Sequence, residues 1–355
     1  MVLQVMKNSA LSAKIHAMSG KVLSPEHYDE LMSLNSVSAV AAYLNERTGY
    51  RTVLQKDSLT LLHRGRLERI LNHGADRDFK AVFHYIEGKN AMFLKSYQVL
   101  GYIESVKLFL RLLYRGASEQ VTEYFDEIVF ENGVVKSAEL ATVTDFSAFA
   151  ELIRKMPVYE ALRTFEQDEK RQKPFFYDVA LDTFYVKTLK KLEKRYLSGA
   201  DRKAAEALFG VETDLSNLSY ILRCKDRFQL SEDEIFASLI PYYHRLTEQI
   251  IQEIVTAPSV KNAMQIIRDK TPYGKAFSAE DRFYEKRIRE FLAEYYHRLA
   301  RKNAYSLQEA ICFIKLRQIE IGNIVSVIEG IRYGLPPEQI RSVLVGYRRK
   351  GDEVS

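Results

Sequence analysis

A helix-ending pattern that occurs three times constrains this chain more than any other feature of its sequence. Tyr50, Tyr159 and Tyr273 each follow apolar residues at offsets of 10, 7 and 6 positions. These apolar residues are Val40, Tyr43 and Leu44, then Phe149, Leu152 and Ile153, then Ala263, Ile266 and Ile267. Apolar residues three and four positions apart share one helix face, so each stretch is expected to be a helix. Three related helical units predict approximate three-fold geometry, which favours a ring, a cup or a collar over a catalytic cleft.

A second pattern, an acidic residue three positions before an asparagine, also occurs three times. Its members are Glu87 and Asn90, Asp214 and Asn217, and Glu320 and Asn323. The distances from each tyrosine to the next such asparagine are 40, 58 and 50 residues. The order of landmarks is constant and the spacing is not, which indicates a diverged triplication with units at residues 1–135, 136–256 and 257–355. Coincidence is the alternative, because helical periodicity alone often places apolar residues before a helix-ending aromatic.

Glycine and proline content favours long helices over a large sheet. The 355 residues include 16 glycines and 8 prolines. Capping signals mark helix starts at Ser231 and Ser278, and Ser24 stands before a proline suited to the first helical position. The fold class predicted from these patterns is all-α.

The strand signal is weak and local. Val129–Phe130 and Val134–Val135 flank the tripeptide at residues 131–133, which contains Asn-Gly. This arrangement fits a short hairpin, and it fits a helix end capped by Asn-Gly equally well.

Charge and cysteine content limit the environment of the protein. The net charge of +5 is small and scattered, which fits an acidic partner or an anionic membrane surface nearby. The two cysteines, Cys224 and Cys312, lie far apart in sequence, so we expect a reducing cytoplasm and buried, inert thiols. Residues 1–14 lack the apolar core of a signal peptide, and no uncharged apolar run is long enough for a membrane-spanning helix. Any association with a membrane is therefore expected to be peripheral.

The sequence contains none of the motifs that mark common catalytic or cofactor sites. A phosphate-binding loop, a dinucleotide fingerprint, a zinc-protease helix, a Cys-x-x-Cys pair and a nucleophile elbow are all absent from it. The seven histidines have no second histidine or cysteine within five residues, so no metal site is expected. The acidic residue and the asparagine of each pair could act as an acid–amide catalytic pair. A structural role is preferred, because buried polar groups on one helix face commonly bond a neighbouring helix. No cofactor is predicted.

Basic residues cluster in two places and raise the question of nucleic-acid binding. Lys187, Lys190, Lys191, Lys194 and Arg195 follow one helix, and a second run lies at residues 348–350. Acidic residues stand close to the first cluster, and neither cluster is paired with an aromatic stacking platform. A solvated helix face is the preferred interpretation, and no nucleic-acid partner is predicted.

The C-terminal stretch at residues 314–340 resembles a known family. It reads E-x-x-N-I and then E-G-I-R-Y-G-L-P-P-E-x-I, which is similar to the C-terminal signature of the C subunits of prokaryotic V-type ATPases, equivalent to the d subunits of eukaryotes. The start of the chain is similar to that family at residues 12–15, 20–24 and 43–50. Residues 85–90 and 214–218 also fit its repeat pattern, so the resemblance extends over essentially the whole chain.

The resemblance implies an all-helical, funnel-like protein without catalytic activity of its own. It implies a place in the central stalk of a V/A-type ATPase, on the cytoplasmic face of the membrane. The implied partners are the shaft subunits D and F and the membrane proteolipid ring, with one copy per complex. The implied role is to couple ATP turnover to H+ or Na+ transport.

Candidate contact residues follow from the same resemblance. Arg223 and the Arg332–Gly334 turn, including Tyr333, lie at unit ends where contact with the shaft or ring is expected. The alternative function, from a different class, is a free-standing helical scaffold for protein or RNA partners. An unrecognised enzyme with convergent carboxylates is a third possibility.

Overall fold

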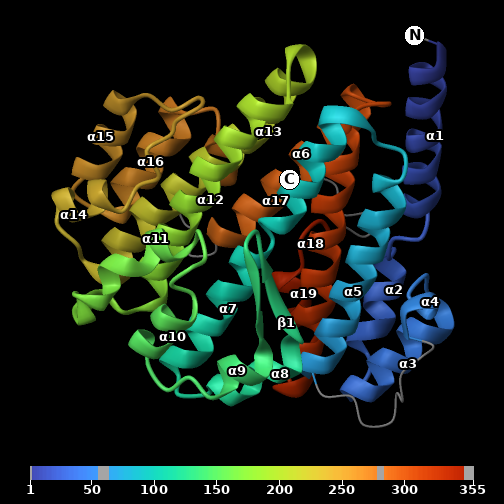
Figure 1. Ribbon diagram of the computed structural model, residues 1–355, viewed down its shortest axis with the longest axis horizontal. Coiled ribbons are helices and arrows are strands. Elements are labelled where there is room, and N and C mark those ends of the chain that lie inside the picture. Colours follow the sequence, from blue (N-terminus) through green and yellow to red (C-terminus); the bar gives the residue numbers. More distant parts are fainter. Residues whose placement is uncertain (1, 55–63, 278–283, 348–355) are drawn as a thin grey trace. The chain divides into compact units, whose positions relative to one another are not determined.

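Helices dominate the protein, as the sequence predicts. The computed structural model describes residues 2–54, 64–277 and 284–347 (Figure 1). Within these ranges the single sheet has two strands, β1 (Glu127–Phe130) and β2 (Gly133–Lys136), paired antiparallel. The all-α fold class is confirmed, and the hairpin interpretation of the Asn-Gly segment is correct.

The chain divides into two compact units, and one of them is discontinuous. The first unit comprises Met1–Glu87 and Lys286–Ser355, and the second comprises Gly88–Glu285. The first unit contains α1 (Val2–Ser19), α2 (Pro25–Met32), α3 (Val37–Arg47), α4 (Arg51–Leu54), α5 (Arg64–Phe83), α18 (Leu307–Arg332) and α19 (Pro337–Val343), with α17 (Tyr284–Lys302) starting at the boundary. The N- and C-terminal parts of the chain thus fold together. The three-part division at residues 135 and 256 stays a prediction about repeats, because it does not describe these compact units.

The second unit contains the hairpin and the remaining helices. Its α-helices are α6 (Gly88–Val99), α7 (Tyr102–Tyr114), α8 (Val121–Tyr124), α9 (Ser137–Ala141), α10 (Phe146–Leu152), α11 (Tyr159–Leu162), α12 (Pro174–Tyr196), α13 (Gly199–Arg223), α14 (Glu232–Ala237), α15 (Glu248–Thr256) and α16 (Val260–Lys270). Shorter helical turns are η2 (Ser118–Gln120), η3 (Arg163–Glu166), η4 (Glu169–Arg171), η6 (Gly274–Ala276) and the π-helical η5 (Cys224–Phe228).

Side-chain caps start the helices that precede the three tyrosines. Ser36, Asp145 and Ser259 stand at the same distance before their tyrosines, and each accepts a hydrogen bond from a first-turn backbone N–H. Such caps satisfy donors that the helix itself leaves unpaired. The capping box predicted at Ser231 and the cap predicted at Ser24 are also present, and the capping box predicted at Ser278 lies outside the described residues.

The apolar offsets before the tyrosines correspond to burial in all three places. The residues at offsets 10 and 6 have no exposed surface, and they are Val40, Leu44, Phe149, Ile153, Ala263 and Ile267. Those at offset 7 are only partly buried, because that position lies on the flank of the same helical stripe. The repeat in the sequence is therefore a repeat in packing.

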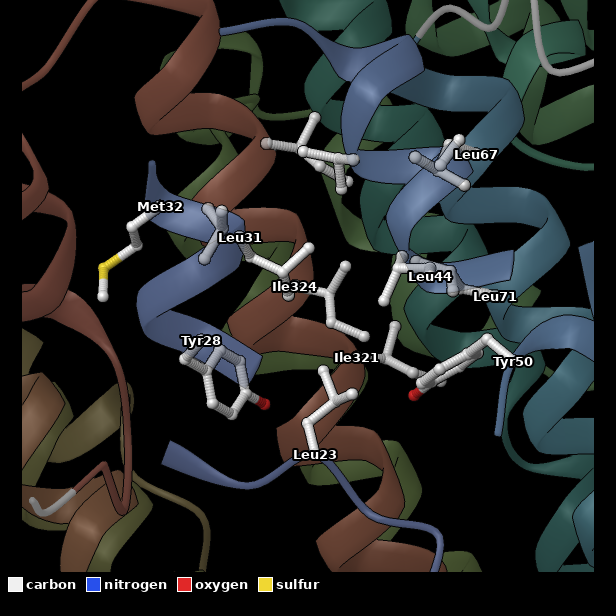
Figure 2. Packing of buried hydrophobic residues seen from close by; sticks show 14 of the residues in the cluster. Leu23, Tyr28, Leu31, Met32, Leu44, Tyr50, Leu67, Leu71, Ile321 and Ile324 are labelled. Carbon is white, nitrogen blue, oxygen red and sulfur yellow. The ribbon is translucent and has the colours of Figure 1, made fainter. Parts of the chain in front are cut away.

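The core of the first unit joins helices from both ends of the chain. Figure 2 shows Leu31 of α2, Ile324 of α18, Leu44 of α3 and Leu71 of α5 lying in one row. Helices α5 and α18 pack along one another (Figure 1). Removing this apolar surface from water stabilises the discontinuous unit, at about 25 cal/mol per Å² buried.

The second unit packs aromatic rings and buried ion pairs between its long helices. Phe109 of α7 lies 4.9 Å from Phe149 of α10, measured between ring centroids. Lys107 of α7 is 6% exposed, and its Nζ lies 2.5 Å from a carboxylate oxygen of Asp182 in α12. Both cysteines of the chain are free and buried, and burial raises the pKa of the Cys224 thiol to about 12. The inert-thiol prediction is consistent with this environment.

Candidate functional site: buried polar clusters and an exposed turn

A buried carboxylate in α18 holds the segment that ends at Tyr50. The Tyr50 hydroxyl donates to Glu320 Oε1 at 2.7 Å, and the Leu23 backbone N–H donates to Oε2 at 3.4 Å. Glu320 is 4% exposed and Tyr50 is 1% exposed. Figure 2 shows Leu23 and Tyr50 on either side of the α18 residue Ile321. The carboxylate thus connects α18, near the C-terminus, to two segments close to the start of the chain.

The asparagine one turn later on the same helix bonds a different segment. Asn323 Nδ2 donates to the Val345 carbonyl at 2.8 Å, and Asn323 Oδ1 accepts from the Val345 N–H at 2.9 Å. Both residues are 5% exposed. A side-chain amide offers a donor and an acceptor in the geometry of a peptide group, so it satisfies both buried backbone groups. We call Tyr50, Glu320 and Asn323 the first polar cluster.

A cation compensates the buried carboxylate of the first polar cluster. Arg317 Nη1 lies 2.5 Å from Glu320 Oε1, and Arg317 Nε lies 3.0 Å from Asp78 in α5. Its guanidinium also lies 5.1 Å from the centre of the Tyr50 ring. Burial raises the pKa of the Glu320 carboxyl, while the Arg317 charge and the Tyr50 hydrogen bond oppose that shift. Burial and the nearby Glu320 charge raise the pKa of Tyr50 well above 10.0, which keeps its hydroxyl as a hydrogen-bond donor.

The second unit repeats this arrangement around Asp214 in α13. The Tyr273 hydroxyl donates to Asp214 Oδ2 at 2.6 Å. The backbone N–H groups of His244 and Arg245 donate to its two carboxylate oxygens at 2.9 and 2.7 Å. Asp214 has no exposed surface, and Tyr273 is 1% exposed. The same tyrosine position therefore bonds the same motif position in both units.

Asn217 completes the second arrangement in the way that Asn323 completes the first. Its Nδ2 donates to the Ile240 carbonyl at 3.0 Å, and its Oδ1 accepts from the Ile240 N–H at 2.8 Å. Asn217 has no exposed surface, and Ile240 is 1% exposed. We call Tyr273, Asp214 and Asn217 the second polar cluster. Four of the predicted motif residues thus fasten helices to turns, and their structural rather than catalytic role stays a prediction.

The motif at Glu87 and Asn90 does not build a third cluster. Glu87 is exposed and precedes α6, which starts at Gly88 with a φ of +61°. Asn90 Nδ2 donates to Asp201 Oδ2 in α13 at 2.9 Å. Tyr159 is only partly buried and donates to its neighbour Glu166 at 3.2 Å. The expectation that this pair lies inside a helix equivalent to α13 and α18 is wrong, because a left-handed glycine separates its two residues.

In the first predicted repeat unit, residues 1–135, the helix that corresponds to α18 is α7. Gly116 and Gly334 both have positive φ, and each follows its long helix. When the two glycines are aligned, the positions of Glu320 and Asn323 correspond to those of Tyr102 and Ser105. Tyr102 is 6% exposed, and its hydroxyl has no hydrogen-bond partner within the described ranges. The spacing from the turn glycine is the sequence signal that would have located this position.

The three residues proposed for partner contacts differ in accessibility. The Arg223 guanidinium lies 5.0 Å from the centre of the Phe175 ring and 3.9 Å from Glu285, and its side chain is 22% exposed. Arg332 is 44% exposed and Tyr333 is 69% exposed. Arg332 lies 3.3 Å from Glu329 and 5.6 Å from the centre of the Tyr333 ring. Arg332 and Tyr333 therefore form an accessible turn, whereas Arg223 is largely enclosed.

The described residues contain no group of histidine, cysteine and acidic side chains that could hold a metal ion. A cavity of about 250 Å³ is lined by Phe236, Tyr243, Glu248, Ile251 and Gln252. It contains one carboxylate and no nucleophile paired with a base, so its lining offers no general acid–base arrangement. No helix in the described ranges is long and apolar enough to cross a membrane.

These contacts define an all-helical protein whose buried polar side chains fasten long helices to the turns that follow them. Residues 11–343 match the family model of the ATP synthase (C/AC39) subunit, and the chain belongs to that family. It is also similar to the C subunit of the A-type ATP synthase of Methanocaldococcus jannaschii. The two are 19% identical over 359 residues, which cover 97% of this chain and 88% of the relative.

Proposed function

We propose that this protein is a non-catalytic central-stalk subunit of a rotary V/A-type ATPase. In this role it connects the shaft subunits D and F to the membrane proteolipid ring and couples ATP turnover to H+ or Na+ transport. The observation that carries the proposal is the family match across residues 11–343. The name of the archaeal relative, the C subunit of an A-type ATP synthase, supports it.

The buried polar clusters suit a part that transmits torque. A coupling subunit must resist twisting, so its helices need fixed relations to the turns that contact other subunits. The first and second polar clusters supply such relations, because Asn323 and Asn217 each hold a turn segment by two hydrogen bonds. Their carboxylates are fully engaged in these contacts rather than directed into a cleft, which supports a structural role for the motif.

The Arg332–Tyr333 turn is the contact surface that we propose for the shaft or ring. It follows α18, the helix that carries the first polar cluster, so a force on the turn is transmitted directly to the core of the first unit. Leu335, 41% exposed, extends the apolar part of this turn. Arginine and tyrosine are the residue types that dominate binding energy at many protein interfaces.

The remaining features of the role follow from the same family membership. We propose one copy per complex, held on the cytoplasmic face of the membrane through the ring. We propose no nucleic-acid partner and no cofactor for this chain.

Binding to the purified neighbours tests the proposal directly. Recombinant full-length chain should retain purified subunits D and F and the detergent-solubilised proteolipid ring in a pull-down. Failure to retain either one would sink the central-stalk role.

Charge reversal at the turn tests the proposed contact. Arg332→Glu should weaken assembly by about tenfold, as expected when one interface arginine worth about 1.4 kcal/mol is lost. Arg163→Glu is the matched control, because Arg163 is also exposed and also pairs with a glutamate three residues earlier. Circular dichroism should show unchanged helicity in both variants. Normal assembly of Arg332→Glu would remove this residue from the contact surface.

A further inference from the structure

The β1–β2 hairpin presents an apolar pair to solvent on one of its faces. Its inner face is buried through Ile128, Phe130 and Val135, which are 1%, 4% and 2% exposed. On the outer face Val129 and Val134 stand directly opposite each other in the strand register and are 50% and 48% exposed. We call Val129 and Val134, with the two strands that carry them, the hairpin face.

The outer face of the hairpin can supply apolar contact area to a partner. Cross-strand valines stabilise one another, but their outer surfaces gain nothing from solvent. Within the described part of the chain, each strand also has one edge without a strand beside it, and open edges are places where another chain can pair. Exposed valines are common on protein surfaces, and an in-register pair beside an unpaired strand edge offers a small apolar contact to a partner that adds a strand.

The chain segment that contains the hairpin face is acidic, although the chain as a whole is basic and the exposed Arg154 and Lys155 directly precede Met156, which lies against Gly133 at the hairpin turn. Residues 118–150 carry one basic side chain, Lys136, and the net charge of the whole chain is +5. The acidic side chains in this range are all exposed, and they are Glu119, Glu123, Asp126, Glu127, Glu131, Glu139 and Asp145. Lys136 stands opposite Glu127 in the strand register, so these two charges offset each other on the outer face. The other six carboxylates of the segment give it an excess of negative charge that a cationic partner would reduce.

We propose that the hairpin face binds a protein partner through an extended segment rich in lysine and arginine that also carries apolar side chains. The apolar side chains cover Val129 and Val134, and the basic side chains lie among the surrounding carboxylates. A strand-like segment fits best, because it can pair with an open edge of the hairpin while its alternate side chains face the valines.

The charge distribution argues against the other classes of partner. Nucleic acid and an anionic lipid surface are polyanions, which this acidic region repels. A symmetric dimer through the hairpin face would bring two acidic surfaces together, since the same patch meets itself about a two-fold axis. The proposal concerns a surface of the second unit that is separate in sequence from the Arg332–Tyr333 turn, and it needs only that the chain assembles with other subunits.

Site-specific photo-crosslinking in the assembled ATPase complex tests this inference. The photoreactive residue p-benzoylphenylalanine replaces Val134, and Lys203, exposed on α13, is the control position. After irradiation, mass spectrometry should identify a crosslink from position 134 to a segment of another subunit in which lysine and arginine exceed aspartate and glutamate. A crosslink only to lipid, only to an acidic segment or only to a second copy of this chain would overturn the proposal, as would no crosslink.

A charge variant separates binding from folding. Glu127→Gln with Glu131→Gln leaves the strands and the valines in place and removes two exposed carboxylates. The crosslink yield from position 134 should fall about three- to tenfold, as expected for the loss of two surface charge pairs, while circular dichroism and retention of the shaft subunits stay unchanged. Unchanged yield would contradict the electrostatic part of the proposal. Failure of the unaltered chain to retain the shaft subunits would instead count against the central-stalk role, independently of the crosslink.

Discussion

The first and second polar clusters perform the same task with different chemistry. In both, a tyrosine hydroxyl donates to a helix carboxylate, and the asparagine three residues later pairs with the backbone of a following segment. The carboxylate of Glu320 is compensated by a side-chain cation, Arg317. The carboxylate of Asp214 is instead satisfied by two backbone N–H groups. The hydrogen-bonding geometry is therefore common to the two units, whereas the compensation of the buried charge differs between them.

The turns that follow the two helices differ in a related way. Gly334 follows Asn323 with a φ of +65°, and Gln229 follows Asn217 with a φ of +49° at a spacing one position longer. The π-helical turn η5 lies between Asn217 and Gln229. A π-helical turn accommodates one extra residue without breaking the helix, so Gln229 reaches the position that Gly334 occupies in the first unit.

The largest expected effect on stability comes from the asparagine that each polar cluster contains. Asn217→Ala and Asn323→Ala each leave a buried backbone N–H and carbonyl without a partner, so each should lower the free energy of unfolding by about 4 kcal/mol. Urea denaturation followed by circular dichroism in the far ultraviolet measures this loss. Asn72→Ala, at an exposed position on α5, is the control and should change stability by less than about 0.5 kcal/mol. A loss confined to one cluster would show that the two are not equivalent.

Removal of a tyrosine hydroxyl should have the second-largest effect on the free energy of unfolding. Tyr50→Phe and Tyr273→Phe each remove a hydrogen bond to a carboxylate and should cost about 2 kcal/mol of unfolding free energy. Arg317→Met distinguishes the clusters in a double-mutant cycle. It should be non-additive with Tyr50→Phe by about 1 kcal/mol, because both residues contact Glu320, and additive with Tyr273→Phe. Coupling of equal size in both cycles would refute separate charge compensation.

Substitutions at the two left-handed turn residues, Gly334 and Gln229, should have smaller effects on stability, and these effects should be opposite in sign. Gly334→Ala should lower the free energy of unfolding by about 1 kcal/mol, because a Cβ at positive φ is strained even though no atom lies near it. Gln229→Gly should relieve the same strain and raise thermal stability slightly. Gly322→Ala, inside α18 and equally free of neighbours, should stabilise by about 0.5 kcal/mol and serves as the control. If all three alanine or glycine changes act in the same direction, the backbone explanation fails.

The smallest expected effect is the pH dependence of stability that Glu320 of the first polar cluster contributes. The pKa of Glu320 is raised from its usual 4.5 by burial, so the folded protein binds a proton more tightly than the unfolded chain. The stability from this site is present below pH 4.5 and decreases as the pH rises through the folded pKa. Denaturation curves at pH 5, 6 and 7 should show a steeper decrease in the native protein than in Glu320→Gln, because burial also raises the pKa of Glu68, Asp178 and Glu193 in both proteins. Identical slopes for the two proteins would contradict the assignment.

The sequence predicts helices, buried faces and the family, because these depend on local order. The spacing before Tyr50, Tyr159 and Tyr273 is enough to locate six completely buried residues, since a helix brings positions four apart onto one face. The same reasoning places Asp214 and Glu320 correctly beside their asparagines. It fails at Glu87, because spacing alone does not reveal that Gly88 adopts a left-handed conformation.

Only the tertiary structure decides which residues meet. The sequence pairs each tyrosine with the motif that follows it, yet Tyr273 bonds the preceding motif and Tyr50 bonds a motif 270 residues later. The Tyr50–Glu320 pair is selected by burial of apolar surface between helices from the two ends of the chain, which joins Met1–Glu87 with Lys286–Ser355 in one unit, whereas Tyr273 and Asp214 both lie in the second unit. The repeated pattern was thus written in the sequence, because helical periodicity is local. Packing decides that helices from the two ends of the chain come together in one unit, because hydrophobic contacts depend on distance in space and not on distance along the chain.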